Sequence, residues 1–320
     1  MIPDPEKRSR RGVIREIAVA LAGALLAASC TLPGPAGTST VREVGSGSWG
    51  QDELWDDGRA EVSAYDAVMM RYGQARRFTA YLIVVKEDFS RRQLVKADPG
   101  HDTTDLFPVL KFNHVIHFPT GTYSYHQMLS VFFDRSDMVP VKLSLAHFEW
   151  CGNTYKELRR RDRHAVLEVN TYWDGEAERR FDIRFSGRTL LYDELPVWLR
   201  SIPWEPKERN WGIEVIPTQV SSRAGNPVPR SATLKIPSGT EEVLVGSETL
   251  EAFRVGMEWE PGEDVFWFHA APPHVLLGWD RSDGGSYRLK WSRRFPYWEL
   301  NQPGDQSRLE VPTPPAVDYR

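Results

Sequence analysis

The alternation of hydrophobic and polar positions predicts β-strands along most of the chain. Short runs rich in β-branched and aromatic residues are separated by Gly, Pro and Asp turn signals. The run at 111–118 alternates most regularly, with one face made of Phe112, His114, Ile116 and Phe118. Further strands are expected at 61–71, 78–85, 123–133, 139–150, 165–173 and 179–184, and then at 231–236, 243–245, 251–258, 264–268, 275–279 and 286–291. This pattern predicts an all-β, mainly antiparallel protein, built as a curved sheet or half-barrel.

One segment departs from the strand pattern. Between 191 and 202 the apolar residues recur at helical spacing, as Leu191, Leu195, Trp198, Leu199 and Ile202. Asp193 is expected to cap the start of this helix, and Pro203 to end it. We therefore expect one or two short helices packed on the sheet. The β domain covers 51–310, either as one unit or as two halves, 51–190 and 205–300, joined by this helix.

The N-terminus has the three parts of a bacterial export signal. Basic residues precede an apolar run at 17–28, which is shorter than the about 20 residues needed to cross a bilayer. Leu26-Ala27-Ala28-Ser29-Cys30 resembles a lipobox, which implies cleavage of residues 1–29 and lipidation of Cys30. An uncleaved anchor helix is the alternative.

The flanking segments suggest how the domain is exported and attached. Arg10-Arg11 resembles a twin-arginine motif, so the choice between that route and general secretion stays open. Thr31 follows Cys30 where inner-membrane retention usually requires aspartate, which favours the outer membrane, facing the periplasm. Residues 30–50 are expected to form a flexible tether, and 311–320 an extended tail.

Charge and cysteine content narrow the possible partners. The predicted mature chain has 35 basic and 41 acidic residues, a net charge of −6, which disfavours nucleic acid as a partner. With Cys30 lipidated, Cys151 is the only cysteine left, so no intrachain disulfide and no cysteine-rich zinc site is expected.

Several stretches together carry a resemblance to known bacterial proteins. The segments WDDGRAEVSAYDAVMMRYGQARRFTAYLIVVKEDF, PVLKFNHVIHFPTGTYSYHQMLSVFF and HFEWCGNTY resemble a family of uncharacterised exported bacterial proteins, often lipoproteins. LLYDELPVWLRSIPW, VLVGSETLEAFRVGM and VFWFHAAPPHVLLGWDRSDGGSYRL are similar to domain-of-unknown-function proteins of the envelope. The resemblance implies a curved antiparallel sheet distantly like the lipoprotein-carrier fold, and it implies no activity.

Histidines near one turn are the best candidates for a metal site. His114, His117 and His126 flank the turn at 119–121. His114 and His117 must point to opposite faces of a strand, because side chains alternate with period 2. His126 can lie opposite one of them across the hairpin. We therefore expect ordinary half-buried histidines, and no metal or cofactor.

A polar site is the alternative to a purely binding protein. His147, Glu149 and Cys151 would share a strand face, but residues two apart on a strand are separated by roughly 6.5–7 Å, which is long for a base activating a thiol. A buried, inert Cys151 is therefore expected. The alternative polar site consists of His117, His126, His147, Glu149 and Cys151. No residue is assigned a catalytic role.

Tryptophan is abundant, with twelve in the chain. Its large apolar face and single donor suit core packing, a lipid cavity or stacking on sugars. The residues expected to line a ligand site are Trp150, Trp198, Trp267, Trp279 and Trp291.

Together these features favour a non-enzymatic, membrane-anchored envelope lipoprotein. Its curved sheet is expected to bind a lipid, another hydrophobic or amphipathic ligand, or an envelope partner. The alternatives are an envelope hydrolase, using a His/Glu/Cys or a carboxylate-pair site, and a polysaccharide-binding module.

Overall fold

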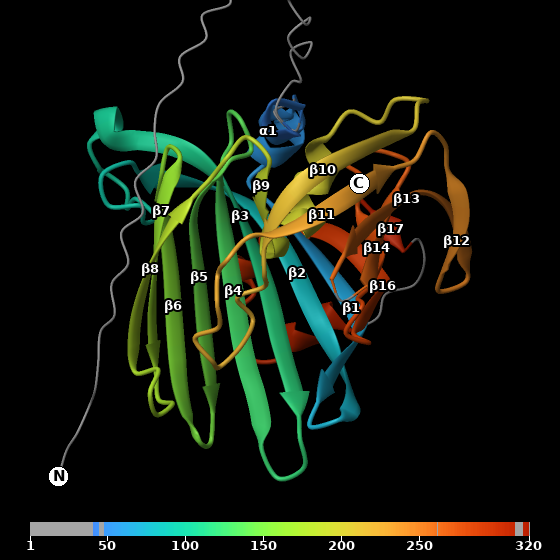
Figure 1. The fold of residues 1–320 in the computed structure, drawn as a ribbon. Helices are drawn as coiled ribbons and strands as arrows, with labels where there is room; N and C mark the ends of the chain where they lie inside the picture. The colour runs from blue at the N-terminus through green and yellow to red at the C-terminus, as the bar shows by residue number, and fades with distance from the viewer. Residues whose placement is uncertain (1–40, 45–47, 261, 311–315, 320) are drawn as a thin grey trace, which may run out of the picture. The chain divides into compact units, whose positions relative to one another are not determined.

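The computed structural model describes residues 41–44, 48–260, 262–310 and 316–319. Seventeen strands in the described residues make a single open sheet, mainly antiparallel and curved (Figure 1). Short helical segments accompany the sheet. The predicted fold class is therefore confirmed. No helix in the described ranges is long and apolar enough to cross a membrane.

The first half of the sheet is an antiparallel meander in chain order, from β1 to β8. Its strands are β1 Ala60–Arg71, β2 Gln74–Ser90, β3 Leu106–Pro119, β4 Ser124–Asp134, β5 Pro140–Glu149, β6 Gly152–Arg161, β7 His164–Thr171 and β8 Glu178–Arg184. The β1–β2 turn has φ of 55° at Tyr72 and 70° at Gly73. Two consecutive residues with positive φ suit a tight hairpin, because this turn matches the twist of the flanking strands.

The second half returns to the other side of β1. Its strands are β9 Thr189–Leu191, β10 Arg209–Ile216, β11 Arg230–Ile236, β12 Glu241–Val245, β13 Glu248–Trp259, β14 Gly262–His269, β15 Leu276–Asp280, β16 Ser286–Phe295 and β17 Val317–Asp318. From β1 the pairing runs through β16, β15, β14, β13, β11 and β10 to β9. β1 therefore lies in the middle of the sheet, with β8 and β9 at its two ends.

The core lies between the facing inner surfaces of the two halves. Leu129, Val131 and Phe133 of β4 are fully buried there, and one hydrophobic cluster joins them to Val255 and Phe266 of the second half. Alternate residues of β2–β7 point to the outer surface instead. The concave side of the sheet is thus filled by protein.

The helical segment predicted near residue 195 exists and lies inside this core. It consists of η4 Tyr192–Glu194, α2 Leu195–Trp198 and η5 Leu199–Ser201, and every one of these residues is buried. Asp193 does not cap the helix as predicted. Its carboxylate accepts hydrogen bonds from Thr218 Oγ1 at 2.5 Å and from the Gln219 amide at 2.7 Å, so it fixes the loop after β10.

A β-bulge interrupts the alternation of inward and outward side chains along β16. Tyr287, Leu289 and Trp291 alternate in the sequence, but the β1–β16 register shifts between Leu289 and Trp291. A bulge inserts one unpaired residue and so reverses the alternation beyond it. Tyr287 and Leu289 therefore belong to the inner core, whereas Trp291 packs with Ala64 in a separate cluster.

Both flanking segments take part in the fold more than expected. Of the predicted tether, α1 Val41–Val44 and η1 Ser48–Gln51 are structured: Val41 is buried, and Trp49 Nε1 donates to the carbonyl of Pro273 at 3.0 Å. Of the predicted tail, β17 pairs in parallel with β16. The predicted signal peptide and Cys30 lie outside the described residues.

Candidate functional site

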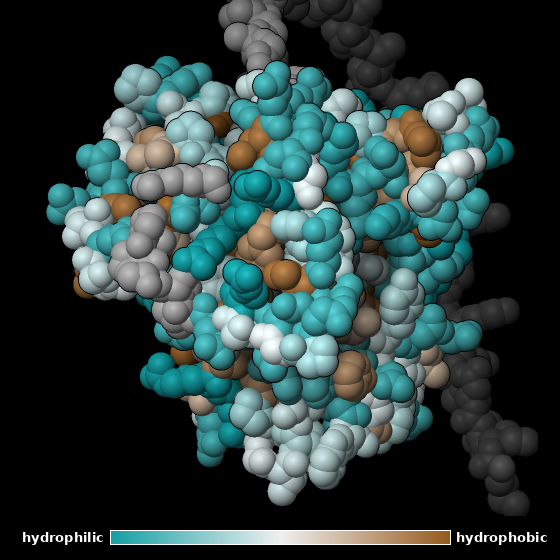
Figure 2. Space-filling view, turned by 180° about the vertical axis from the view of Figure 1, so that it is seen from behind, coloured by the Kyte–Doolittle hydropathy of each residue, from teal (hydrophilic) through white to brown (hydrophobic). Residues whose placement is uncertain are grey.

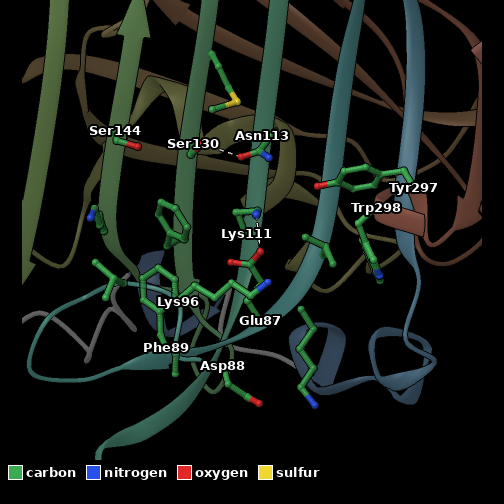
Figure 3. Close-up of a pocket in the computed structure, with 17 residues that line it drawn as sticks. Glu87, Asp88, Phe89, Lys96, Lys111, Asn113, Ser130, Ser144, Tyr297 and Trp298 are labelled. Carbon is green, nitrogen blue, oxygen red and sulfur yellow. Dashed lines mark hydrogen bonds and ion pairs between the residues drawn. The ribbon is translucent and has the colours of Figure 1, made fainter. Parts of the chain in front are cut away.

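The outer surface of β2–β5 carries a pocket of about 700 Å³ (Figure 3). This volume lies in the range of small-molecule sites. The pocket is lined by side chains of four neighbouring strands, of the connection between β2 and β3, and of the segment after β16. Residues of different character line it, including Glu87, Lys96, Lys111, Asn113, Ser130 and Tyr297.

Neutral hydrogen-bonding groups form the floor of this pocket. Asn113 of β3 and Ser130 of β4 are direct cross-strand partners, and both are buried. Ser130 Oγ donates to Asn113 Oδ1 at 2.7 Å. The amide nitrogen of Asn113, with two donors, has no partner among the described residues. Ser130 thus orients an amide whose N–H groups are free to meet a ligand.

Charged groups form one wall. Lys111 Nζ makes an ion pair with Glu87, and Lys142 Nζ lies 3.0 Å from Glu157 and donates to the carbonyl of Leu94 at 3.1 Å. In the described part of the chain, the ammonium of Lys96 has neither an ion-pair nor a hydrogen-bond partner. The wall therefore has one positively charged side chain, Lys96, without a partner among the described residues, beside the ion pairs made by Lys111 and Lys142.

The segment after β16 closes the pocket on the other side. η6 Tyr297–Glu299 places Tyr297 and Trp298 in the lining, and in Figure 3 the hydroxyl end of Tyr297 points towards Asn113. Burial, together with the negative charge of Glu87, raises the pKa of Tyr297. The phenol is therefore protonated at neutral pH and can donate a hydrogen bond.

An apolar pocket of about 420 Å³ adjoins the first, and Tyr297 lines both. Strand residues such as Val62, Ile83 and Val115 form its base. Leu300 and Leu309 come from the segment after β16, in which η7 Asp305–Leu309 lies. The same segment also contributes polar lining residues, Gln302, Asp305, Gln306 and Arg308, so the pocket is mainly but not wholly apolar. Figure 2, seen from behind relative to Figure 1, shows a predominantly polar surface with small apolar patches. The outer face thus combines a polar and an apolar pocket side by side.

The structure does not gather the five predicted tryptophans into one site. Trp198 and Trp279 are buried in the main core, and Trp150 is 80 % exposed in the turn after β5. Trp267 is half-buried and donates to Glu241 at 2.6 Å. Only Trp291 lies near the pockets, since its ring centroid is 6.5 Å from that of Tyr81, which lines the apolar pocket.

The predicted histidine arrangement is partly as expected. His114 is buried on the inner face and His117 is exposed on the outer face, as the alternation predicts. His126 is the cross-strand partner of His117, and their rings stack with centroids 4.0 Å apart. No group of three or more metal-ligating side chains occurs in the portion that the structure describes.

The other part of the polar set does not form a catalytic arrangement. His147 is buried and its Nδ1 is 2.9 Å from Gln127 Nε2. Glu149 accepts the Cys151 amide at 2.6 Å. The expectation of a buried Cys151 is wrong, because β5 ends at Glu149 and the cysteine lies exposed in the turn. Cys151 is therefore not placed on the strand face of His147.

The pocket residues were not predicted as a site, although part of the signal is in the sequence. The alternation at 111–118 places Lys111 and Asn113 on one face, opposite the core residues. A polar pair on the outer face of a central strand is also typical of a solvated surface, so the pattern alone does not distinguish the two. The contribution of Tyr297 depends on how the chain returns across the sheet.

Comparison with known proteins identifies no relative: no family model, no curated protein and no solved structure matches this chain.

Proposed function

We propose that this protein binds a small amphipathic molecule, with its polar head in the pocket at Asn113 and its apolar part in the pocket at Ile83. The observation that carries the proposal is that the two pockets adjoin at Tyr297 on one face of the sheet. A fatty acid or a single-chain lipid has the two kinds of surface that this pair of pockets would cover. The site is on the convex side, because core residues fill the concave side.

The polar pocket favours binding over catalysis. Ser130 Oγ donates a hydrogen bond to Asn113 Oδ1, an amide oxygen that cannot act as a base, and Lys111 is held in an ion pair with Glu87. Nucleophilic catalysis needs a hydroxyl or amine activated by a neighbouring base or by a lowered pKa. The groups present instead suit recognition of a polar head by hydrogen bonds and by the Lys96 ammonium.

We further propose that the protein carries out this binding as a lipid-anchored envelope protein, with Cys30 as the anchor, facing the periplasm from the outer membrane. Ten residues separate Cys30 from Val41. At no more than about 3.6 Å per residue, they span at most roughly 36 Å. Such a tether would keep the domain close to its membrane. Metabolic labelling with a palmitate analogue tests the anchor: the wild type should be labelled and Cys30→Ser should not, and an unlabelled wild type would exclude it.

Binding is tested by titrating the purified protein with a fluorescent C16 fatty acid and, separately, with palmitoyl lysophosphatidylglycerol. Ile83→Arg places a charge in the apolar pocket and should weaken binding at least tenfold. The matched control is Leu244→Arg, since Leu244 is 70 % exposed on β12 and lines neither pocket. Its affinity should equal that of the wild type. Circular dichroism shows whether both variants are folded.

Two results would contradict the proposal. One is a wild type that binds neither probe at 100 μM. The other is a folded Ile83→Arg variant that binds both probes as tightly as the wild type.

A further inference from the structure

A second depression lies on the outer surface of the sheet, and it shares no lining residue with the paired pockets. It is an open depression of about 600 Å³ that spans β5 to β8. Its lining residues are close in sequence to the β5–β6 and β7–β8 turns, which lie at the same end of the sheet in Figure 1. The exposed side chains that line it include Phe148, Asn153, Tyr155, Asn170 and Glu178.

Strand register places these side chains in a regular row. Tyr155 of β6 pairs with Asn170 of β7, which pairs in turn with Glu178 of β8. Phe148 pairs with Asn153 beside them. Side chains directly opposite each other on one face have Cβ atoms about 4.5–5.5 Å apart. Tyr155, Asn170 and Glu178 are thus aligned across β6, β7 and β8, and the Phe148–Asn153 pair lies two residues further along β5 and β6. These five side chains together are called the row.

The polar groups of the row have unused hydrogen-bonding capacity. In the residues that the structure describes, the side-chain amides of Asn153 and Asn170 and the carboxylate of Glu178 have no partner. Each amide offers two donors and an acceptor, and the carboxylate offers only acceptors. A ligand that both donates and accepts, as a hydroxyl does, can use all of them. No lysine or arginine lines this depression.

Aromatic rings extend the row towards β3. Phe148 is 53 % exposed, and its ring stacks on that of His126 with centroids 4.5 Å apart and an interplanar angle of 2°. His126 stacks on His117 in turn. Partial burial and the neighbouring His117 lower the pKa of His126, which keeps this ring uncharged at neutral pH. The Phe148 ring thus has an uncharged aromatic neighbour covering one of its faces.

Exposed aromatic residues also occupy the turns at this end of the sheet. Trp150 is 80 % exposed, with its ring centroid 6.2 Å from that of Tyr123 in a stacked arrangement. Tyr172 is 58 % exposed and packs on Gly152, where a Cβ would come within 2.4 Å of its ring. Large exposed rings of this kind gather at sites that bind partners with one apolar face.

We propose that this row binds a neutral oligosaccharide, with sugar faces stacked on the exposed rings and hydroxyl groups bonded to Asn153, Asn170 and Glu178. An anionic ligand would meet the carboxylate of Glu178 with no cation in the lining. A peptide could not add as a strand over the centre of the row, because β5, β6 and β7 are each paired on both sides. A neutral sugar chain can stack on the rings and form hydrogen bonds with the amides.

The test is isothermal titration calorimetry on the purified full chain with two neutral probes, cellotetraose and the β-1,4-linked tetramer of N-acetylglucosamine. Trigalacturonic acid is the anionic comparison, and phosphatidylcholine vesicles are the lipid comparison. At least one neutral probe should bind more tightly than both comparisons. Asn153→Ala combined with Asn170→Ala should weaken that binding at least tenfold, and Leu244→Ala should change it less than twofold.

Phe148→Ala provides a second test of the same row. It should weaken binding of the neutral probe at least fivefold, because it removes the most exposed aromatic ring of the lining. The proposal is overturned if neither neutral probe binds at 5 mM, if the anionic probe or the vesicles bind more tightly, or if the folded variants bind like the wild type. The amphiphile titration uses other residues, so either proposal can fail while the other stands.

Discussion

Arg200 and Glu61 form a buried, bidentate ion pair that joins the helical segment to β1. Arg200 Nη1 and Nη2 each lie 2.7 Å from one carboxylate oxygen of Glu61, and both side chains are 3 % exposed. Tyr319 donates to the same carboxylate at 2.8 Å, and Arg200 Nε donates to the carbonyl of Pro273. One pair of charges therefore connects four segments that are far apart in the sequence.

We predict that Glu61→Gln destabilises the protein by about 3–5 kcal/mol, because removal of one partner leaves a buried charge without compensation. The free energy of unfolding is measured by urea denaturation at pH 7. The matched control is Glu168→Gln, which breaks the exposed pair with Arg180 and should cost less than about 1 kcal/mol. Equal losses in the two variants would show that the buried pair has no special role.

His114 should make the protein sensitive to acid. It is fully buried, and burial lowers its pKa to about 3, with a further contribution from the positive charge of Arg281. Between pH 6.5 and 4 the unfolded chain binds a proton at this site and the folded chain does not, so stability falls as the pH falls. The expected loss from this residue is about 3 kcal/mol over that interval.

The test of this prediction is His114→Phe, because the surrounding rings of Phe112, Trp279 and Tyr287 accept another aromatic side chain. The free energy of unfolding of this variant should fall about 3 kcal/mol less than that of the wild type between pH 6.5 and 4. Part of the pH dependence should persist, since burial also lowers the pKa of His147, to about 4. His164→Phe, at an exposed position, should follow the wild type. If the free energy of unfolding depends on pH in the same way in His114→Phe and in the wild type, the pH dependence does not come from His114.

Cys151 should react slowly for an exposed thiol. The hydrogen bond to Glu149 raises the pKa of the Cys151 thiol, with smaller effects of burial and of the Glu149 charge in the same direction. Because the thiolate is the reactive form, Glu149→Gln should speed alkylation by iodoacetamide at pH 8 by about threefold. The rate is followed by mass spectrometry of the Cys151 peptide. Glu168→Gln should leave it unchanged, and an equal or slower rate in Glu149→Gln would count against this account.

The strands could be predicted from the sequence because local alternation determines them. The opposite facing of His114 and His117 and the pairing of His117 with His126 follow from a period of two and one short turn. These features depend on residues close together in the chain. The same local information fails at Cys151, which lies in the turn because the strand ends at Glu149.

The candidate site depends on relationships that no local pattern contains. The β1–β16 bulge moves Trp291 to the outer face. The segment after β16 then places Tyr297 over strands that lie about 200 residues earlier in the chain. The alternation shows that Asn113 and Phe112 lie on opposite faces, but it does not show which segment covers each face. That outcome is decided by tertiary packing, which also buried the predicted tryptophans Trp198 and Trp279.

The central position of β1 has a consequence for synthesis. One side of this strand pairs with β2 as soon as residue 84 is available, whereas its other side pairs with β16, which ends at residue 295. A nascent chain that has not reached β16 therefore presents β1 as an unpaired edge, and such edges pair readily with other chains. Nearly the whole protein must therefore leave the ribosome before this edge is covered, and until then the incomplete chain exposes a pairing surface that the finished one does not.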